Sequence, residues 1–181
     1  PGGAQSQLLQ RKAQRRPMDL LHALIALGGS EVDEAALAAA LWADSEGDAA
    51  IQAVATTLHR LRRLIGNQTI VHHDRRLSLD FRHCFVDSLA CSRIFADASA
   101  STDQTLHALA LYRGRFLQDN DATWVLEHAR ALSTRYVRAT HRCAEQLVQL
   151  GDSARAIQRD EPALRHEPGG THEGAAHLRV R

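Results

Sequence analysis

The sequence has few of the features that mark membrane-spanning and disulfide-rich proteins. Aromatic residues make up only 4% of the 181 residues, and the three cysteines include no CxxC pair. This cysteine pattern gives no disulfide framework and no zinc-binding spacing, and it suits a reducing compartment. No apolar run approaches the roughly 20 residues that a membrane-spanning helix needs, and no secretion signal is visible. We therefore expect a cytoplasmic protein that makes no membrane contact.

Motifs for catalysis and for cofactor binding are missing as well. There is no nucleophile elbow, no glycine-rich phosphate loop and no motif that pairs two acids. His72 and His73 are adjacent, which is poor geometry for one tetrahedral ion, and His166, His172 and His177 lie near the end of the chain. We expect no enzyme activity, no cofactor and no metal, and we interpret the histidines as surface residues whose charge depends on pH.

Acidic residues are absent from one long segment, "AAIQAVATTLHRLRRLIG", which runs from residue 49 to 66. At 100° per residue its apolar side chains fall within an arc of roughly 80°, so the segment predicts a helix over 49–65 that ends at Gly66. The predicted core stripe consists of Ile51, Val54, Leu58, Leu61 and Ile65. The opposite side carries Gln52, Thr56, His59, Arg60 and Arg63. Arg62 falls on the flank, where a packing or ion-pair role is expected.

This polar side has two interpretations from the residues alone. It is either a solvated helix face or a face that contacts a polyanion. The net charge of +1 does not indicate a nucleic-acid binder, so any basic surface must be local.

The neighbouring segments predict the rest of a small domain. Pro17 suits the first turn of a helix that stops at Gly28 and Gly29. Asp33 is expected to cap a second helix that ends near Trp42, and the segment after Gly66 predicts a hairpin over 69–81 with the polar turn HHDRR. In that hairpin Leu77, Leu79 and Phe81 alternate with polar residues. Two helices, a long helix and a hairpin follow the order of a winged helix-turn-helix.

The second half of the chain has helical periodicity. Segments 87–98 and 105–114 predict a helical pair, segment 124–150 predicts a longer helix, and one more helix is expected from residue 153. Helix pairs of this size resemble tetratricopeptide (TPR) repeats. The aromatic residues Trp42, Trp124 and Tyr136 lie on helical stripes and are expected in the core. The same expectation applies to Cys84, Cys91 and Cys143.

Together these patterns predict a mainly α fold, with a winged helix-turn-helix and its small β-hairpin followed by a TPR-like helical domain. We expect a basic N-terminal segment at 1–16, a winged-helix DNA-binding domain at 17–84 and a TPR-like domain at 85–158. Prolines, glycines and aperiodic apolar residues predict a disordered tail at 159–181.

Several motifs in this order resemble a known family. RKAQRRPMDLLHALIALGG, ALAAALW, TLHRLRRLIG and RRLSLD are similar to the OmpR-type winged-helix domain. ALALYRGRFL, the Trp124 segment and LVQLGDSARAI are similar to the bacterial transcriptional activator domain that accompanies it in SARP-like and MalT-like regulators. The resemblance covers residues 10–158. The family has a small amino-terminal sheet, for which only residues 1–16 remain, so we expect that sheet to be truncated or reduced to one strand.

The resemblance implies a bacterial transcription regulator that binds double-stranded DNA. A recognition helix offers one face to the major groove, where arginine can pair with guanine and a threonine methyl can touch thymine. The candidates for base contact are Gln52, Thr56, His59 and Arg60. The candidates for phosphate contact are Arg63, Arg75, Arg76, Lys12, Arg15 and Arg16.

The helical half is expected to make protein contacts. Its partner is RNA polymerase, a sensory domain of a longer protein, or a second copy in a homodimer. The alternative function is a protein-interaction module that no longer binds DNA because the amino-terminal sheet is missing.

Overall fold

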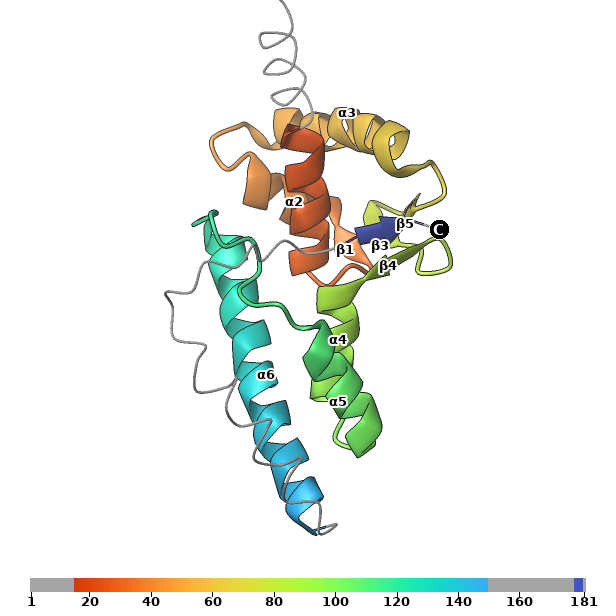
Figure 1. The fold of residues 1–181 in the computed structure, drawn as a ribbon. Helices are drawn as coiled ribbons and strands as arrows, with labels where there is room; N and C mark the ends of the chain where they lie inside the picture. Colours follow the sequence, from red (N-terminus) through yellow and green to blue (C-terminus); the bar gives the residue numbers. More distant parts are fainter. Residues whose placement is uncertain (1–14, 150–177, 181) are drawn as a thin grey trace, which may run out of the picture. The chain divides into compact units, whose positions relative to one another are not determined.

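The computed structural model describes residues 15–149 and 178–180. As predicted, the fold is mainly helical with a small antiparallel sheet (Figure 1). The chain divides into two compact units: the first runs to Phe85 and includes the terminal residues from Arg179, and the second begins at Val86. The terminal strand β5 (Leu178–Val180) pairs with β4 (Cys84–Val86) in a two-stranded sheet.

The first helix covers residues 15–26 and supplies much of the core of the first unit. Leu20, Leu21, Leu24 and Ile25 are almost completely buried. The helix ends where predicted, because Gly28 and Gly29 both adopt positive φ and the Gly29 N–H donates to the Leu24 carbonyl at 2.8 Å. Residues 15 and 16 are already helical, so the helix extends into the basic segment expected at 1–16, and Pro17 lies in the first turn that the structure describes.

Helix α2 (Glu34–Leu41) begins as predicted at Asp33. The Asp33 Oδ1 atom accepts a hydrogen bond from the Ala35 N–H at 2.7 Å, which satisfies one of the free donors of the first turn. Val32 and Asp33 also form strand β1, which the sequence pattern did not indicate.

Helix α3 (Gly47–Ile65) begins two residues before the predicted start and ends at the predicted Gly66. Val54, Leu58 and Leu61 are buried, whereas Ile51 and Ile65 are half-buried at the two ends of the stripe. The Thr69 hydroxyl donates to the Ile65 carbonyl at 2.7 Å and satisfies one acceptor of the last turn.

The three-stranded sheet has the order β1-β3-β2, with β2 at Ile70–His73 and β3 at Arg76–Leu79. Leu77 pairs with Val32 on one side and with His72 on the other, so these residues share one face of the sheet. Leu77 and Leu79 are buried as predicted. Phe81 is 50% exposed and lies beyond the end of β3, so its predicted place in the alternation is wrong and the hairpin is shorter than 69–81.

The described part of the second unit contains three helices, α4 (Asp87–Ala96), α5 (Thr102–Leu111) and α6 (Thr123–Gln149), which pack against one another. A capping box at Ser101 and Gln104 starts α5. Tyr136 lies in the centre of the core: its ring stacks on Tyr112 at 4.3 Å and meets Phe95 edge-on at 6.0 Å between ring centroids. The other fully buried members of this cluster are Cys91, Ala108, Leu109, Leu132, Ala139, Cys143 and Leu147.

The predicted core residues have mixed outcomes. The three cysteines are buried and free, and burial raises the pKa of the Cys91 thiol to about 12. Tyr136 is buried as well, but Trp42 and Trp124 are only half-buried. Val125, adjacent to Trp124, is completely buried instead.

Some predictions fall outside the described residues. They concern the amino-terminal sheet up to residue 14, the helix from residue 153, and the disordered tail at 159–181, of which only β5 is described. Among the helices that the structure describes, none combines the length and the apolar character that crossing a membrane requires.

Candidate nucleic-acid interface

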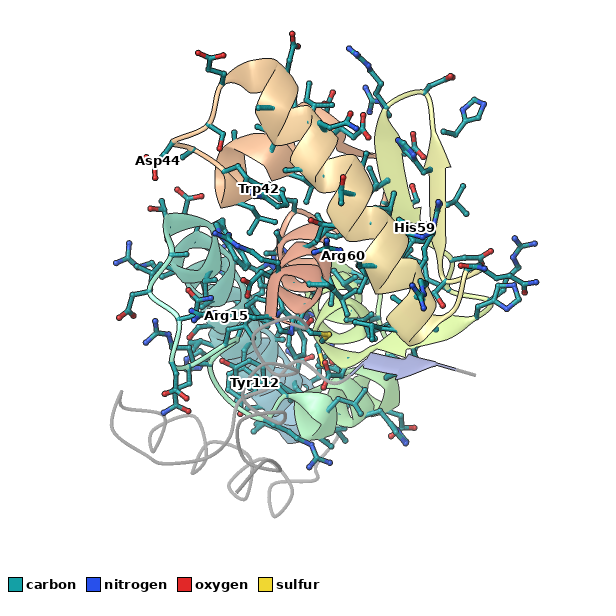
Figure 2. The ribbon with its side chains drawn as sticks, turned by 90° about the horizontal axis from the view of Figure 1, so that it is seen from above. Arg15, Trp42, Asp44, His59, Arg60 and Tyr112 are labelled. Atoms are coloured by element: carbon teal, nitrogen blue, oxygen red, sulfur yellow. The ribbon has the colours of Figure 1, made fainter. Side chains whose placement is uncertain are left out.

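Helix α3 presents the predicted polar side to solvent. Gln52, Thr56, His59, Arg60 and Arg63 are all exposed. Figure 2 shows the side chains of His59 and Arg60 extending from this helix. Burial of Leu58 and Leu61 fixes the rotation of α3 about its axis, so the same stripe that anchors the helix also determines which residues face outward.

The cationic side chains on this face are available to a ligand. Within residues 15–149, the side chains of Arg60 and Arg63 have no hydrogen-bond or ion-pair partner. The Thr56 hydroxyl donates to the Gln52 carbonyl at 3.0 Å, so its hydrogen is used within the helix.

Arg62 has a different role, as its position on the flank predicted. Its Nη2 donates to the Ile70 carbonyl at 2.8 Å and so joins the last turn of α3 to strand β2. The orientation of the hairpin relative to the helix therefore depends partly on this side chain.

The hairpin ends in a two-residue turn formed by Asp74 and Arg75. Both have positive φ, of 47° and 60°, and the flanking residues His73 and Arg76 are paired. This is the pattern of a type I′ turn, which matches the twist of the strands but is unfavourable for a residue such as arginine. The Arg75 side chain is exposed at the tip.

Arg76 differs from Arg75 in its surroundings. Its Nη1 donates to the Glu31 carbonyl at 3.3 Å, and its cross-strand neighbour is the acidic Asp33. The Ser78 hydroxyl binds the Glu31 carboxylate beside it at 3.0 Å. Of the two hairpin arginines, Arg75 is therefore the one whose charge is less compensated.

The N-terminus of α2 holds the hairpin in place through two contacts of Glu34. The Glu34 N–H donates to the Arg75 carbonyl at 2.9 Å. The buried Glu34 carboxylate lies 3.1 Å from His72 Nε2, so the acid is compensated by a ring nitrogen of β2. The hairpin tip is thus tied to the helix layer through both backbone and side chain.

Asp80 stabilises the other end of the hairpin. Its carboxylate binds the Arg82 guanidinium, at 2.6 Å for Oδ2 to Nη2 and 2.9 Å for Oδ1 to Nε, and also accepts from the Arg82 N–H. These hydrogen bonds lower the pKa of Asp80 to about 2. Sequence reasoning missed this pair, for which the only signal was an acid two residues before an arginine at a strand end.

The amino-terminal candidates for phosphate contact differ in their surroundings. Lys12 lies outside the described residues, and Arg15 is exposed. The Arg16 Nη1 donates to the Leu41 carbonyl at 3.2 Å, and its guanidinium lies 5.8 Å from the centroid of the Trp42 ring. Arg16 therefore caps the end of α2, a contact the sequence did not indicate.

The first unit has no general excess of positive charge. Over residues 15–85, eight arginines stand against nine aspartates and glutamates, which gives a net charge of −1 with histidines neutral. Three exposed acids, Asp44, Glu46 and Asp48, gather at the start of α3. Any attraction for a polyanion must therefore come from the distribution of charge within the unit.

The described residues offer no site for a metal. Within 15–149 and 178–180, no group of three or more His, Cys, Asp or Glu side chains could hold an ion.

Comparison with known proteins gives one family match. No curated protein and no solved structure matches the chain. Residues 85–173 match the bacterial transcriptional activator domain, so the predicted resemblance of the second half is confirmed. The match begins at the boundary between the two units and extends beyond residue 158, where we expected the domain to end. The description of the matched domain is that of transcriptional activators.

Proposed function

We propose that the first unit is an OmpR-type winged helix-turn-helix that binds double-stranded DNA in a sequence-specific manner. In this proposal α2 and α3 are the helix-turn-helix, and the hairpin of β2 and β3 is the wing. The observation that carries it is the exposed face of α3, which has uncompensated arginines and no acid from Ala49 to Gly66. The adjoining match to an activator domain supports it, because that domain implies a regulator of transcription.

Base recognition is assigned to the exposed face of α3. Arg60 can make paired hydrogen bonds to the major-groove edge of guanine, and the methyl group of the exposed Thr56 can contact thymine. His59 and Gln52 are the other candidates, since both are exposed on the same face.

Phosphate contact is assigned first to Arg63 and Arg75. Both are exposed, one at the end of α3 and the other at the tip of the wing. Arg76, Arg15 and Arg16 are secondary candidates, because Arg76 and Arg16 already bind backbone carbonyls of this unit.

The helical unit is proposed to make protein contacts in the cytoplasm rather than to catalyse a reaction. RNA polymerase, a sensory domain of a longer protein, and a second copy are the partners considered. A protein-interaction module without DNA binding is the second candidate function, and the net charge of −1 over residues 15–85 favours it.

Fluorescence anisotropy separates these two functions. It compares a duplex selected from random sequences for binding to this protein (the selected duplex) with a scrambled duplex of the same composition. Arg60→Ala should cost about 1–3 kcal/mol on the selected duplex and relax its sequence preference, because a base edge is lost. Arg75→Gly should weaken binding to every duplex about equally and lower the salt slope by about one unit. Glycine accepts the positive φ of this turn, so the loss cannot be attributed to unfolding.

Arg93→Ala is the matched control. Arg93 is an exposed arginine of α4 in the second unit, so its replacement removes the same charge without changing any residue of the proposed interface. If the wild type binds no duplex at low salt, the DNA-binding proposal fails. If Arg93→Ala weakens binding as much as Arg60→Ala, the assignment of base recognition to α3 fails.

A further inference from the structure

The charges along α3 are sorted by sign. Asp44 and Glu46 lie in the connection before the helix, and Asp48 lies in its first turn. The arginines Arg60, Arg62 and Arg63 all lie toward the other end. Figure 2 shows Asp44 at the connection and His59 and Arg60 farther along the helix. Both charge groups are placed where they complement the helix dipole.

The two ends of α3 are far apart along the helix axis. With a rise of about 1.5 Å per residue, Asp48 and Arg60 are separated by roughly 18 Å along the axis. At physiological salt the screening length is about 8 Å, so a charge at one end of α3 has little effect on a phosphate at the other.

We infer that α3 enters the major groove with its C-terminal half, residues 56–63, and that its N-terminal turn lies outside the contact. This inference rests on the proposed DNA binding. Recognition helices of the helix-turn-helix type ordinarily use their N-terminal residues to contact base edges. In this chain that arrangement would bring the exposed Asp48 and Glu46 against phosphates. Their carboxylates would cancel the attraction that a helix N-terminus has for an anion.

The position of the hairpin also favours DNA contact through the C-terminal end of α3. Arg62 binds the Ile70 carbonyl at 2.8 Å, and the Thr69 hydroxyl binds the Ile65 carbonyl at 2.7 Å. The strand that leads to the tip therefore starts directly from the C-terminal end of α3. Arg63 of the helix and Arg75 of the tip thus belong to elements joined at the end that carries no acid.

This orientation divides the candidate residues for base contact. Thr56, His59 and Arg60 lie in the half that enters the groove. Gln52 lies only one turn after Asp48 and about 12 Å along the axis from Arg60, so it does not read a base.

Single substitutions test this orientation when the affinity for DNA is measured by fluorescence anisotropy in about 0.15 M salt. Asp48→Asn and Gln52→Ala should each change the affinity for the selected duplex by less than about two-fold. Arg60→Ala should lower it by about five-fold or more. Asp103→Asn is the matched control for Asp48→Asn, because Asp103 is an exposed acid in the first turn of α5 in the second unit.

Asp44→Asn removes an acidic charge without changing α3, because Asp44 precedes α3 and belongs to no helix. It therefore controls for an effect of Asp48→Asn on the helix itself. The orientation is overturned if Asp48→Asn or Asp44→Asn raises the affinity about ten-fold above the control. It is also overturned if Gln52→Ala weakens binding as much as Arg60→Ala. Such results would leave DNA binding intact, whereas a wild type that binds no duplex would overturn both proposals.

Discussion

Replacement of Leu61 by alanine tests the rotation of α3, on which the whole interface depends. Leu61 has no exposed surface, whereas Leu64 on the same helix is 47% exposed. Removing a buried leucine side chain costs its transfer energy plus the energy of the cavity, about 3 kcal/mol within a range of 2–5. Leu64→Ala makes the same chemical change at the surface and should cost about 0.5 kcal/mol or less.

The two tryptophans of the chain allow the unfolding of each unit to be followed separately. Trp42 lies in the first unit and Trp124 in the second. In a Trp124→Phe background, emission in guanidinium titrations reports the first unit alone. A loss of about 3 kcal/mol corresponds to a fall of roughly 12–24 °C in Tm for a unit of this size.

Two results would refute the reasoning. Leu64→Ala could prove as damaging as Leu61→Ala, which would mean that the helix is rotated and that Arg60 and Arg63 are not free. Alternatively, Leu61→Ala could leave the emission transition of Trp42 unchanged, which would mean that Leu61 does not belong to the core of the first unit.

Three further predictions concern groups around this core. Because the folded pKa of Asp80 is about 2, below its unfolded value, its stabilising effect should be lost as pH falls from about 5 toward 2; Asp80→Asn should flatten this part of a plot of unfolding free energy against pH. Burial lowers the pKa of His22, although Asp19 opposes the shift, so stability should also fall as pH drops below about 6.5; calorimetry of His22→Gln should show a weaker dependence there. Gly66→Ala should cost about 1 kcal/mol or more in chemical denaturation, because φ at this position is +96°.

The elements that could be predicted are those set by local chemistry and periodicity. The spacing of Val54, Leu58 and Leu61 determines the buried side of α3, and this in turn places His59 and Arg60 on the exposed side. A capping aspartate at the start of α2 and glycines at two helix ends are equally local signals.

The elements that could not be predicted depend on residues far apart in the sequence. Strand β1 has only two residues and exists because Val32 pairs with Leu77. Arg16 binds a carbonyl at the end of α2, and Arg76 binds the carbonyl of Glu31. Sequence alone ranks these arginines equally with Arg75, since it does not reveal which cations are already engaged.

Nuclear magnetic resonance of labelled protein titrated with the selected duplex tests the DNA-binding surface most directly. The account predicts that backbone amide shifts concentrate at residues 56–63 of α3 and at residues 73–76 of the hairpin, with small changes in α4, α5 and α6. A scrambled duplex should shift the hairpin amides but leave those near Arg60 less affected, because phosphates are the same in both sequences. Shifts confined to α4, α5 and α6, or no shifts at low salt, would contradict the account.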